Sequence, residues 1–165
     1  MNHHVLGIDP GTTGGWALIA PGLPVALGRW AKDGVGGARE ILDRISYYGG
    51  HIFMERVSSS PIQSQKSAFT FGENFGHWKG LVSALRSPHR KREDKTTFTL
   101  VQPQTWQKPI PGIAGIRVLN LTAAQKYRMR KNLIKDYIKE LYPVPGITLE
   151  NADALAIAHY GLNSL

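Results

Sequence analysis

Residues 5–19, Val-Leu-Gly-Ile-Asp-Pro-Gly-Thr-Thr-Gly-Gly-Trp-Ala-Leu-Ile, decide the fold of this chain. The stretch predicts a buried strand that ends in Asp9, a glycine-rich reversal and a second strand. A carboxylate at the edge of a core is costly unless it is solvated, paired or bound to a cation. Asp9 is therefore either a metal ligand or the capping residue of an Asp-Pro-Gly turn.

The composition is that of an ordinary globular protein with a positive charge. The 165 residues, 42% hydrophobic and 19% charged, predict one domain over residues 1–165. A net charge of +8 favours a polyanionic partner, with nucleic acid as the first candidate. The lack of cysteine excludes disulfides, thiolate nucleophiles and cysteine metal sites. No apolar run reaches the length of a membrane span and no signal-peptide pattern opens the chain, so we expect a cytoplasmic protein without a membrane partner.

Hydrophobic periodicity divides the chain into an α/β pattern. Strands are predicted at 5–8, 15–19, 25–30, 52–55 and 97–101, and helices at 38–48, 67–85, 122–141 and from about 149 onward. The first three strands form an antiparallel meander. The helix at 38–48 then makes a crossover that sets strand 52–55 parallel to strand 5–8. We therefore expect a mixed five-stranded sheet flanked by helices.

Four acidic residues stand at the positions where such a sheet forms a cleft. Glu55 ends its strand as Asp9 ends its own, and carboxyl ends of neighbouring parallel strands border ligand clefts. Glu150 and Asp153 are three residues apart, which places both on one face of the last helix. Alternatively, Glu55 pairs with a basic residue and the helical pair caps its helix. Together, the four carboxylates have the oxygen ligands and charge that two Mg²⁺ ions require.

Basic residues concentrate in two segments. Segment 86–95 contains five of them, and the helix at 122–141 carries a cationic face. The candidates for phosphate contact on that helix are Lys126, Arg128, Arg130 and Lys131. A solvated surface is the alternative interpretation of both segments.

Several motifs together resemble the RuvC-type Holliday junction resolvases of the ribonuclease H-like superfamily, especially their phage and chloroplast branches. The resemblance rests on Gly7-Ile8-Asp9-Pro10-Gly11, Met54-Glu55, residues 67–72 with Phe75-Gly76, residues 103–108 and residues 152–158. It covers most of the chain. It implies a ribonuclease H-like fold and an endonuclease that resolves four-way DNA junctions by paired, two-metal hydrolysis of phosphodiesters.

The resemblance also implies roles for single residues. The family's catalytic carboxylates correspond to Asp9, Glu55 and Asp153, and Glu150 stands at a fourth ligand position that is often Asp or His. The ions would be Mg²⁺, with Mn²⁺ possible. Lys108 and Lys126 correspond to phosphate-stabilising lysines, and the candidates for a side chain inserted into the junction are Ile62, Gln63 and Gln65.

A homodimer is implied as well, because a four-way junction has two-fold symmetry. The glycines Gly72, Gly76 and Gly80 form a smooth ridge on the helix at 67–85, which we expect to be the dimer face. Three other functions stay open: a nuclease acting on RNA–DNA hybrids or other branched DNA, a non-catalytic DNA-binding module, and an ATP-binding protein of the actin-like or sugar-kinase type. The length of the chain counts against the last, since those folds duplicate this unit.

Overall fold

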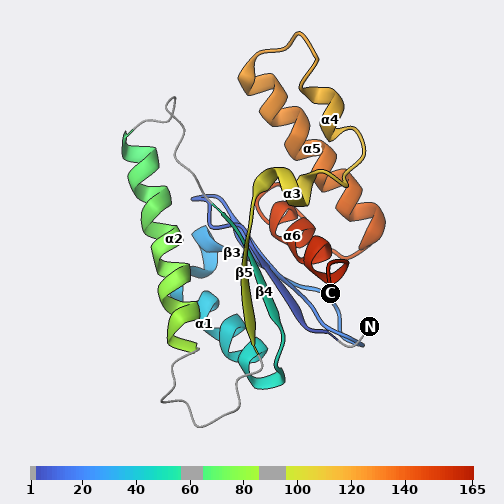
Figure 1. Ribbon diagram of the computed structural model, residues 1–165. Helices are drawn as coiled ribbons and strands as arrows, with labels where there is room; N and C mark the ends of the chain where they lie inside the picture. Colours follow the sequence, from blue (N-terminus) through green and yellow to red (C-terminus); the bar gives the residue numbers. More distant parts are fainter. Residues whose placement is uncertain (1–2, 57–64, 86–95) are drawn as a thin grey trace.

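A mixed five-stranded sheet with helices on both faces forms the core of the protein in a computed structural model that describes residues 3–56, 65–85 and 96–165 (Figure 1). The strands are β1 (Val5–Ile8), β2 (Gly15–Ile19), β3 (Ala26–Arg29), β4 (His51–Glu55) and β5 (Thr97–Val101). The helices are α1 (Trp30–Tyr48), α2 (Gln65–Leu85), α3 (Pro103–Gln107), α4 (Ile113–Ile116), α5 (Ala123–Leu141) and α6 (Ala152–Leu162). The predicted fold class is confirmed.

The strand order is β3-β2-β1-β4-β5. β1 pairs antiparallel with β2 and parallel with β4, and β5 extends the parallel part at the edge. In the parallel pair Ile8 is the register partner of Met54. Asp9 directly follows Ile8, and Glu55 directly follows Met54. The predicted adjacency of the two acids therefore follows from the pairing of the strands.

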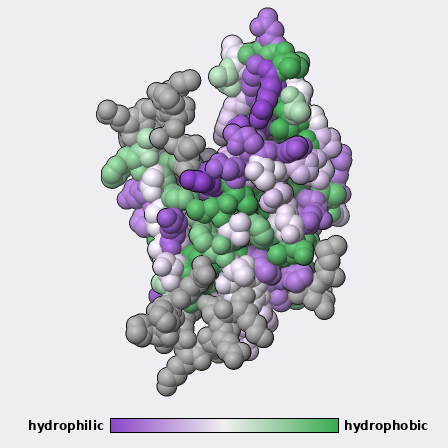
Figure 2. Space-filling view, viewed as in Figure 1, coloured by the Kyte–Doolittle hydropathy of each residue, from purple (hydrophilic) through white to green (hydrophobic). Residues whose placement is uncertain are grey.

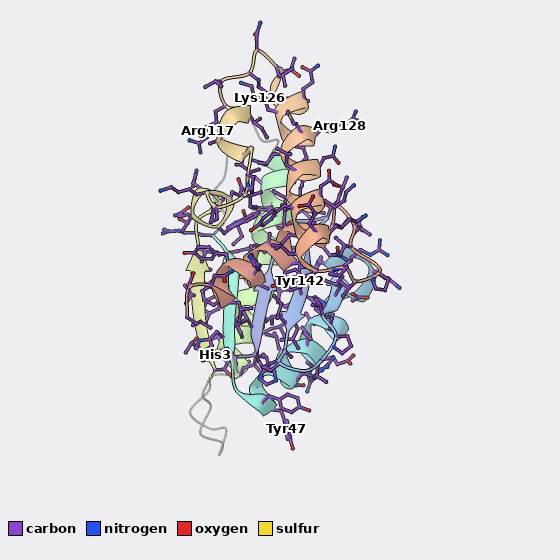
Figure 3. The ribbon with its side chains drawn as sticks, turned by 90° about the vertical axis from the view of Figure 1, so that its right-hand side faces the viewer. His3, Tyr47, Arg117, Lys126, Arg128 and Tyr142 are labelled. Atoms are coloured by element: carbon purple, nitrogen blue, oxygen red, sulfur yellow. The ribbon has the colours of Figure 1, made fainter. Side chains whose placement is uncertain are left out.

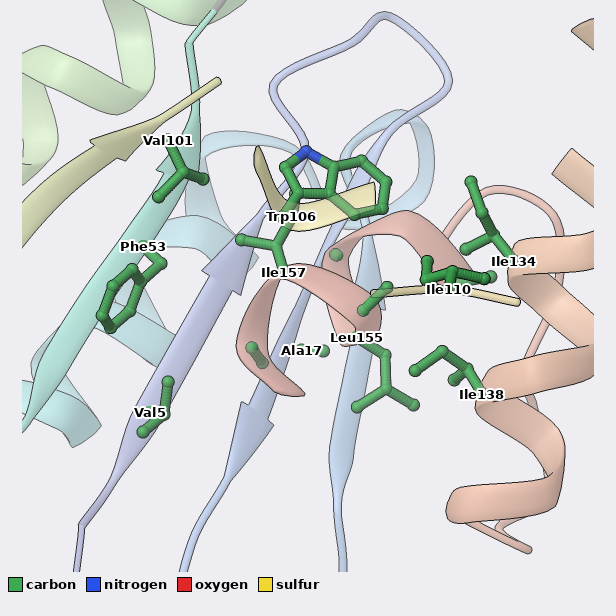
Figure 4. Packing of buried hydrophobic residues seen from close by; sticks show 14 of the residues in the cluster. Val5, Ala17, Phe53, Val101, Trp106, Ile110, Ile134, Ile138, Leu155 and Ile157 are labelled. Atoms are coloured by element: carbon green, nitrogen blue, oxygen red, sulfur yellow. The ribbon is translucent and has the colours of Figure 1, made fainter. Parts of the chain in front are cut away.

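Residues alternate between two hydrophobic clusters on the two faces of the sheet. Leu6, Ile8 and Met54 pack with α1 and α2, whereas Val5 and Phe53 pack with α3, α5 and α6 (Figures 1 and 4). Because side chains alternate along a strand, Asp9 and Glu55 fall on the α6 side of the sheet. The alternation therefore decides which helix can complete the site.

Helix α6 lies very close to β1. A Cβ atom at Gly7 would collide with the carbonyl oxygen of Ala154 and the backbone nitrogen of Ala158. Gly7 thus permits an approach that any other residue would block. The close contact fixes the first turn of α6 beside the end of β1.

Several element boundaries differ from the sequence-based expectation, and the largest differences are in the helices. Helix α1 begins at Trp30 rather than at 38 and is interrupted at Gly34, whose φ of 57° is left-handed. Trp30 packs against the Trp78 ring at 5.5 Å, and this tertiary contact favours helix where glycines weaken the periodicity. The Pro- and Gly-rich segment 109–115 predicts a loop, but the short helix α4 begins within it, at Ile113, and α6 begins only at Ala152. Among the described residues, no helix combines the length and the hydropathy that a membrane crossing demands.

Candidate active site

The two oxygens of the Asp9 carboxylate make different contacts. Its Oδ1 accepts a hydrogen bond of 2.9 Å from the backbone N–H of Gly11, which is the turn-capping contact. Its Oδ2 lies 3.9 Å from the Nζ of Lys131, on the side of the site. Gly14 packs against the same carboxyl group so closely that a Cβ would collide there. The glycines therefore make room for the buried acid.

Glu55 lies at the end of β4 and is held by Trp106 from α3. The indole Nε1 donates a hydrogen bond of 3.2 Å to Oε1 of Glu55. Figure 4 shows the Trp106 ring resting on the cluster beside Ile157, with its nitrogen at the upper edge. Burial raises the pKa of Glu55 to about 8, and the charges of Asp9 and Asp153 act in the same direction.

Asp153 enters the site from the first turn of α6. It is 7% exposed, and its Oδ2 accepts a hydrogen bond of 2.8 Å from the Nζ of Lys131. Its Oδ1 is buried and has no hydrogen-bond partner within the described part of the chain. An acceptor oxygen in this state is costly, and it faces a site that already holds two other carboxylates.

The electrostatics of the three acids depend on burial and mutual repulsion. Burial, and after it the charge of Asp153, raise the pKa of Asp9 to about 6, although Lys131 and the Gly11 N–H oppose the shift. Burial alone would lower the pKa of Lys131, but the charges of Asp153 and Asp9 outweigh it and hold that pKa above its usual value. Lys131 therefore carries a positive charge inside a cluster of acids.

Glu150 does not join this cluster. Its Oε2 lies 2.7 Å from Nη1 of Arg29, the last residue of β3. The reason is the late start of α6: Glu150 precedes the helix, so the argument that Glu150 and Asp153 share a helical face does not apply. The helix-capping alternative applies to Asp153, which lies in the first turn of α6, where the helix dipole favours a negative charge, but not to Glu150.

The other basic candidates line the outer part of α5 and the end of α3. Lys126 donates a hydrogen bond of 3.1 Å to the carbonyl of Arg117, and the guanidinium of Arg130 lies 5.3 Å from the Tyr127 ring centroid. Lys126 and Arg128 project at the far end of α5, away from the sheet (Figure 3). Figure 2 shows hydrophilic residues along this part of the surface, from the top of the molecule toward its middle.

Lys108 stands at the exposed C-cap of α3. It makes no ion pair with an acid in the described ranges 3–56, 65–85 and 96–165. Ile62, Gln63 and the basic segment 86–95 lie outside the described residues, and Gln65 is the first residue of α2. The roles of these residues stay predictions.

The donor set fits a hard divalent cation in its chemistry. Asp9, Glu55 and Asp153 offer only oxygen ligands, which Mg²⁺ and Mn²⁺ favour, and Asp153 Oδ1 has an unused acceptor site. As placed in the described part of the structure, however, no three Asp, Glu or His side chains are arranged to hold an ion. The Lys131 ammonium lies between the acids instead.

Sequence reasoning missed two members of the site. The sequence predicts Lys131 as a phosphate contact, whereas in the structure its Nζ lies against Asp9 and Asp153. Trp106 enters the sequence-based prediction only as part of the motif at 103–108. For Lys131 no local signal exists, since its partner Asp153 is 22 residues away. For Trp106 the sequence signal is weak: the indole N–H of a tryptophan on a short helix next to loops indicates that a hydrogen-bond acceptor is near.

Comparison with solved structures supports the fold, whereas the comparisons of sequence find no match. No protein-family model matches the chain, and no curated protein sequence matches it. Among solved structures, the chain is similar to Thermus thermophilus RuvC in complex with Holliday junction substrate, with a TM-score of 0.57 and 14% identity over 98% of this chain and 96% of that one. A second Thermus thermophilus RuvC structure gives a TM-score of 0.56 and 16% identity over the same shares. The chain therefore has the RuvC fold, a ribonuclease H-like sheet flanked by helices, as the motifs predicted.

Proposed function

We propose that this protein is a metal-dependent, structure-selective DNA endonuclease that resolves four-way junctions by paired hydrolysis of phosphodiester bonds. The observation that carries the proposal is the convergence of Asp9, Glu55 and Asp153 on one face of the sheet. Two strand ends and one helix contribute these acids, in the fold of a protein whose structure is known with Holliday junction substrate.

The three acids are the ligands we assign to Mg²⁺, or to Mn²⁺ in its place, with two ions per site as the working hypothesis. When bound, such ions supply an activated water nucleophile and stabilise the charge on the leaving oxygen. Trp106 orients Glu55 through its indole N–H, and the Gly11 N–H orients Asp9. Glu150 is the proposed fourth ligand, and it can serve only after leaving Arg29.

The DNA partner is proposed from charge. Lys126, Arg128 and Arg130 lie on α5 and have no acidic partner among the described residues. Such cations bind phosphates through counterion release, which makes binding salt-dependent and sequence-independent. Lys108 is the proposed residue for charge stabilisation near the scissile phosphate, because it follows Trp106 by two positions.

The homodimer is proposed from helix α2. Gly72, Gly76 and Gly80 have open space where a Cβ would stand, so the ridge is uncovered in the described structure. Phe69, 74% exposed, lies on the same helix. A ridge of glycines permits close packing of two helices, and a two-fold dimer matches the symmetry of a four-way junction.

A cleavage panel tests the proposed function. Synthetic four-way junctions, flaps, linear duplexes and RNA–DNA hybrids are incubated with Mg²⁺, Mn²⁺ or EDTA. We expect paired cuts in the four-way junction with either ion, no cutting in EDTA, and loss of cutting in Asp9→Asn with DNA binding retained. Asp136→Asn, which changes an exposed acid on α5, is the matched control and should cut normally.

The same panel separates the alternatives. Preferred cutting of the hybrid would favour a ribonuclease H activity, and binding without cutting in any ion would favour a non-catalytic module. Tight binding of ATP in the presence of Mg²⁺ with no junction cleavage would favour the ATP-binding alternative.

A further inference from the structure

The ammonium of Lys131 occupies the space between the acids that we assign to the divalent cation. It lies 2.8 Å from Oδ2 of Asp153 and 3.9 Å from Oδ2 of Asp9. Its side chain is 12% exposed, so the contact is buried and weakly screened by salt. Buried acids of this kind require a positive partner, and in the described structure Lys131 is that partner.

One ammonium cannot balance the cluster. Asp9, Glu55 and Asp153 together carry more negative charge than Lys131 neutralises when all three are ionised, and Oδ1 of Asp153 keeps an unused acceptor site. A divalent cation would neutralise more of this negative charge than a single ammonium, and it would offer a partner to Oδ1 of Asp153. However, the ion and the ammonium cannot share the same oxygen ligands without strong repulsion.

A second position is available to the ammonium of Lys131. Its Nζ lies 6.0 Å from the ring centroid of Tyr127, within the range of a cation–π contact. The lysine stem is flexible and its donors rotate, so a change of rotamer can move the charge from the acids toward this ring.

We propose that Lys131 is a built-in counter-ion that holds the place of the divalent cation in the metal-free site and withdraws from Asp153 when the ion binds. The inference rests on the proposed function, because it takes the three acids as metal ligands. It goes further in giving this chain's own lysine a role as a competitor of the ion. Removing the ammonium should therefore tighten metal binding, whereas removing a lysine that merely positions Asp153 should weaken it.

The experiment compares metal binding without DNA in the wild type, Lys131→Met, Lys131→Gln and the control Lys135→Met. Lys135 lies one turn further along α5 and makes no ion pair with a described acid. Affinity for Mn²⁺ and Mg²⁺ is measured by calorimetry on folded protein. The ¹⁵Nζ resonance of Lys131, assigned by its absence in Lys131→Met, is followed by NMR during an Mg²⁺ titration. The glutamine variant keeps a hydrogen-bond donor beside Asp153 in case the methionine variant does not fold.

We expect both Lys131 variants to bind the ions about tenfold more tightly or better, since one competing charge has gone. The control should match the wild type, and the Lys131 resonance should shift on addition of Mg²⁺. Equal or weaker binding in both variants, or a resonance that does not move at saturation, overturns this inference and leaves the proposed function standing. If no variant binds an ion, the proposed metal site fails and the inference fails with it.

Discussion

Nη1 of Arg29 lies 2.7 Å from Oε2 of Glu150, which joins the end of β3 to the residues that precede α6. Both side chains are partly exposed, at 39% and 40%, so the pair stabilises the fold only modestly. The ion pair is important because it fixes the direction of the Glu150 side chain. It directs the proposed fourth ligand away from Asp9, Glu55 and Asp153.

Glu150 should therefore matter less than the central acids. We expect Glu150→Gln to lower the rate of junction cleavage by about 10–100-fold, because a ligand that must first leave Arg29 contributes less than one that already lies in the cluster. Asp153→Asn should lower it on the order of 10³-fold or more, because it removes an inner ligand. Single-turnover cleavage with Mg²⁺ measures both rates. Equal losses in the two variants would show that Glu150 is an inner ligand of equal weight.

The indole donor of Trp106 should tune the acidity of Glu55. Its hydrogen bond lowers the pKa of Glu55 against the larger effect of burial. Trp106→Phe keeps an aromatic ring but removes the N–H, so the pKa of Glu55 should rise further in the metal-free protein. A ¹³C NMR titration of the carboxyl groups measures it. Trp78→Phe is the control: this indole lies in the cluster on the opposite face and its N–H has no partner among the described residues.

The metal-free protein should lose stability as the pH rises toward 8. Folded Asp9 and Glu55 have pKa values of about 6 and about 8, so above about pH 4 they keep protons that the unfolded chain releases. The folded state then binds more protons, and the free energy of unfolding falls with pH.

Urea unfolding in EDTA measures this decline. The lowered pKa values of His51 and His159 act in the opposite direction below about pH 6.5, so the decline is cleanest between about pH 7 and about pH 8. Glu55→Gln should flatten it. A slope unchanged in that variant would assign the decline to another group.

Gly7 should be essential to the packing of α6. Gly7→Ala places a Cβ against the backbone of the helix, and we expect a loss of about 3 kcal/mol or more in the free energy of unfolding. Gly36→Ala, in α1 with open space around it, should change stability by no more than about 1 kcal/mol. Chemical denaturation of both variants makes the comparison. Similar stabilities would mean that α6 can move away from β1 at little cost.

The glycine ridge of α2 should carry the dimer. Gly76→Leu adds bulk in open space, so the protomer should fold normally while self-association weakens. Light scattering across a concentration series measures the oligomeric state, and circular dichroism checks the fold. A wild-type protein that stays monomeric at all concentrations would contradict the proposed dimer. If the protein is a dimer and Gly76→Leu does not weaken it, the dimer interface lies on another face.

Local patterns predicted most of the fold. Three local patterns depend only on neighbours in the chain, and the structure confirms them: the short apolar runs at 5–8 and 52–55, the helical spacing of Ile41, Leu42 and Ile45, and the Thr122 cap of α5. The start of α1 could not be predicted in the same way, because it depends on the contact between Trp30 and Trp78.

The sequence by itself determined that Asp9 and Glu55 are neighbours, because each follows a short buried strand and a helical crossover makes those strands parallel. It also determined the close approach of α6, through Gly7 and the alanines of the helix. Only the tertiary structure decided which charges meet. Side chains from distant segments pair according to where their helices and loops begin, so Glu150 turns to Arg29 and Lys131 enters the acids beside Asp9 and Asp153.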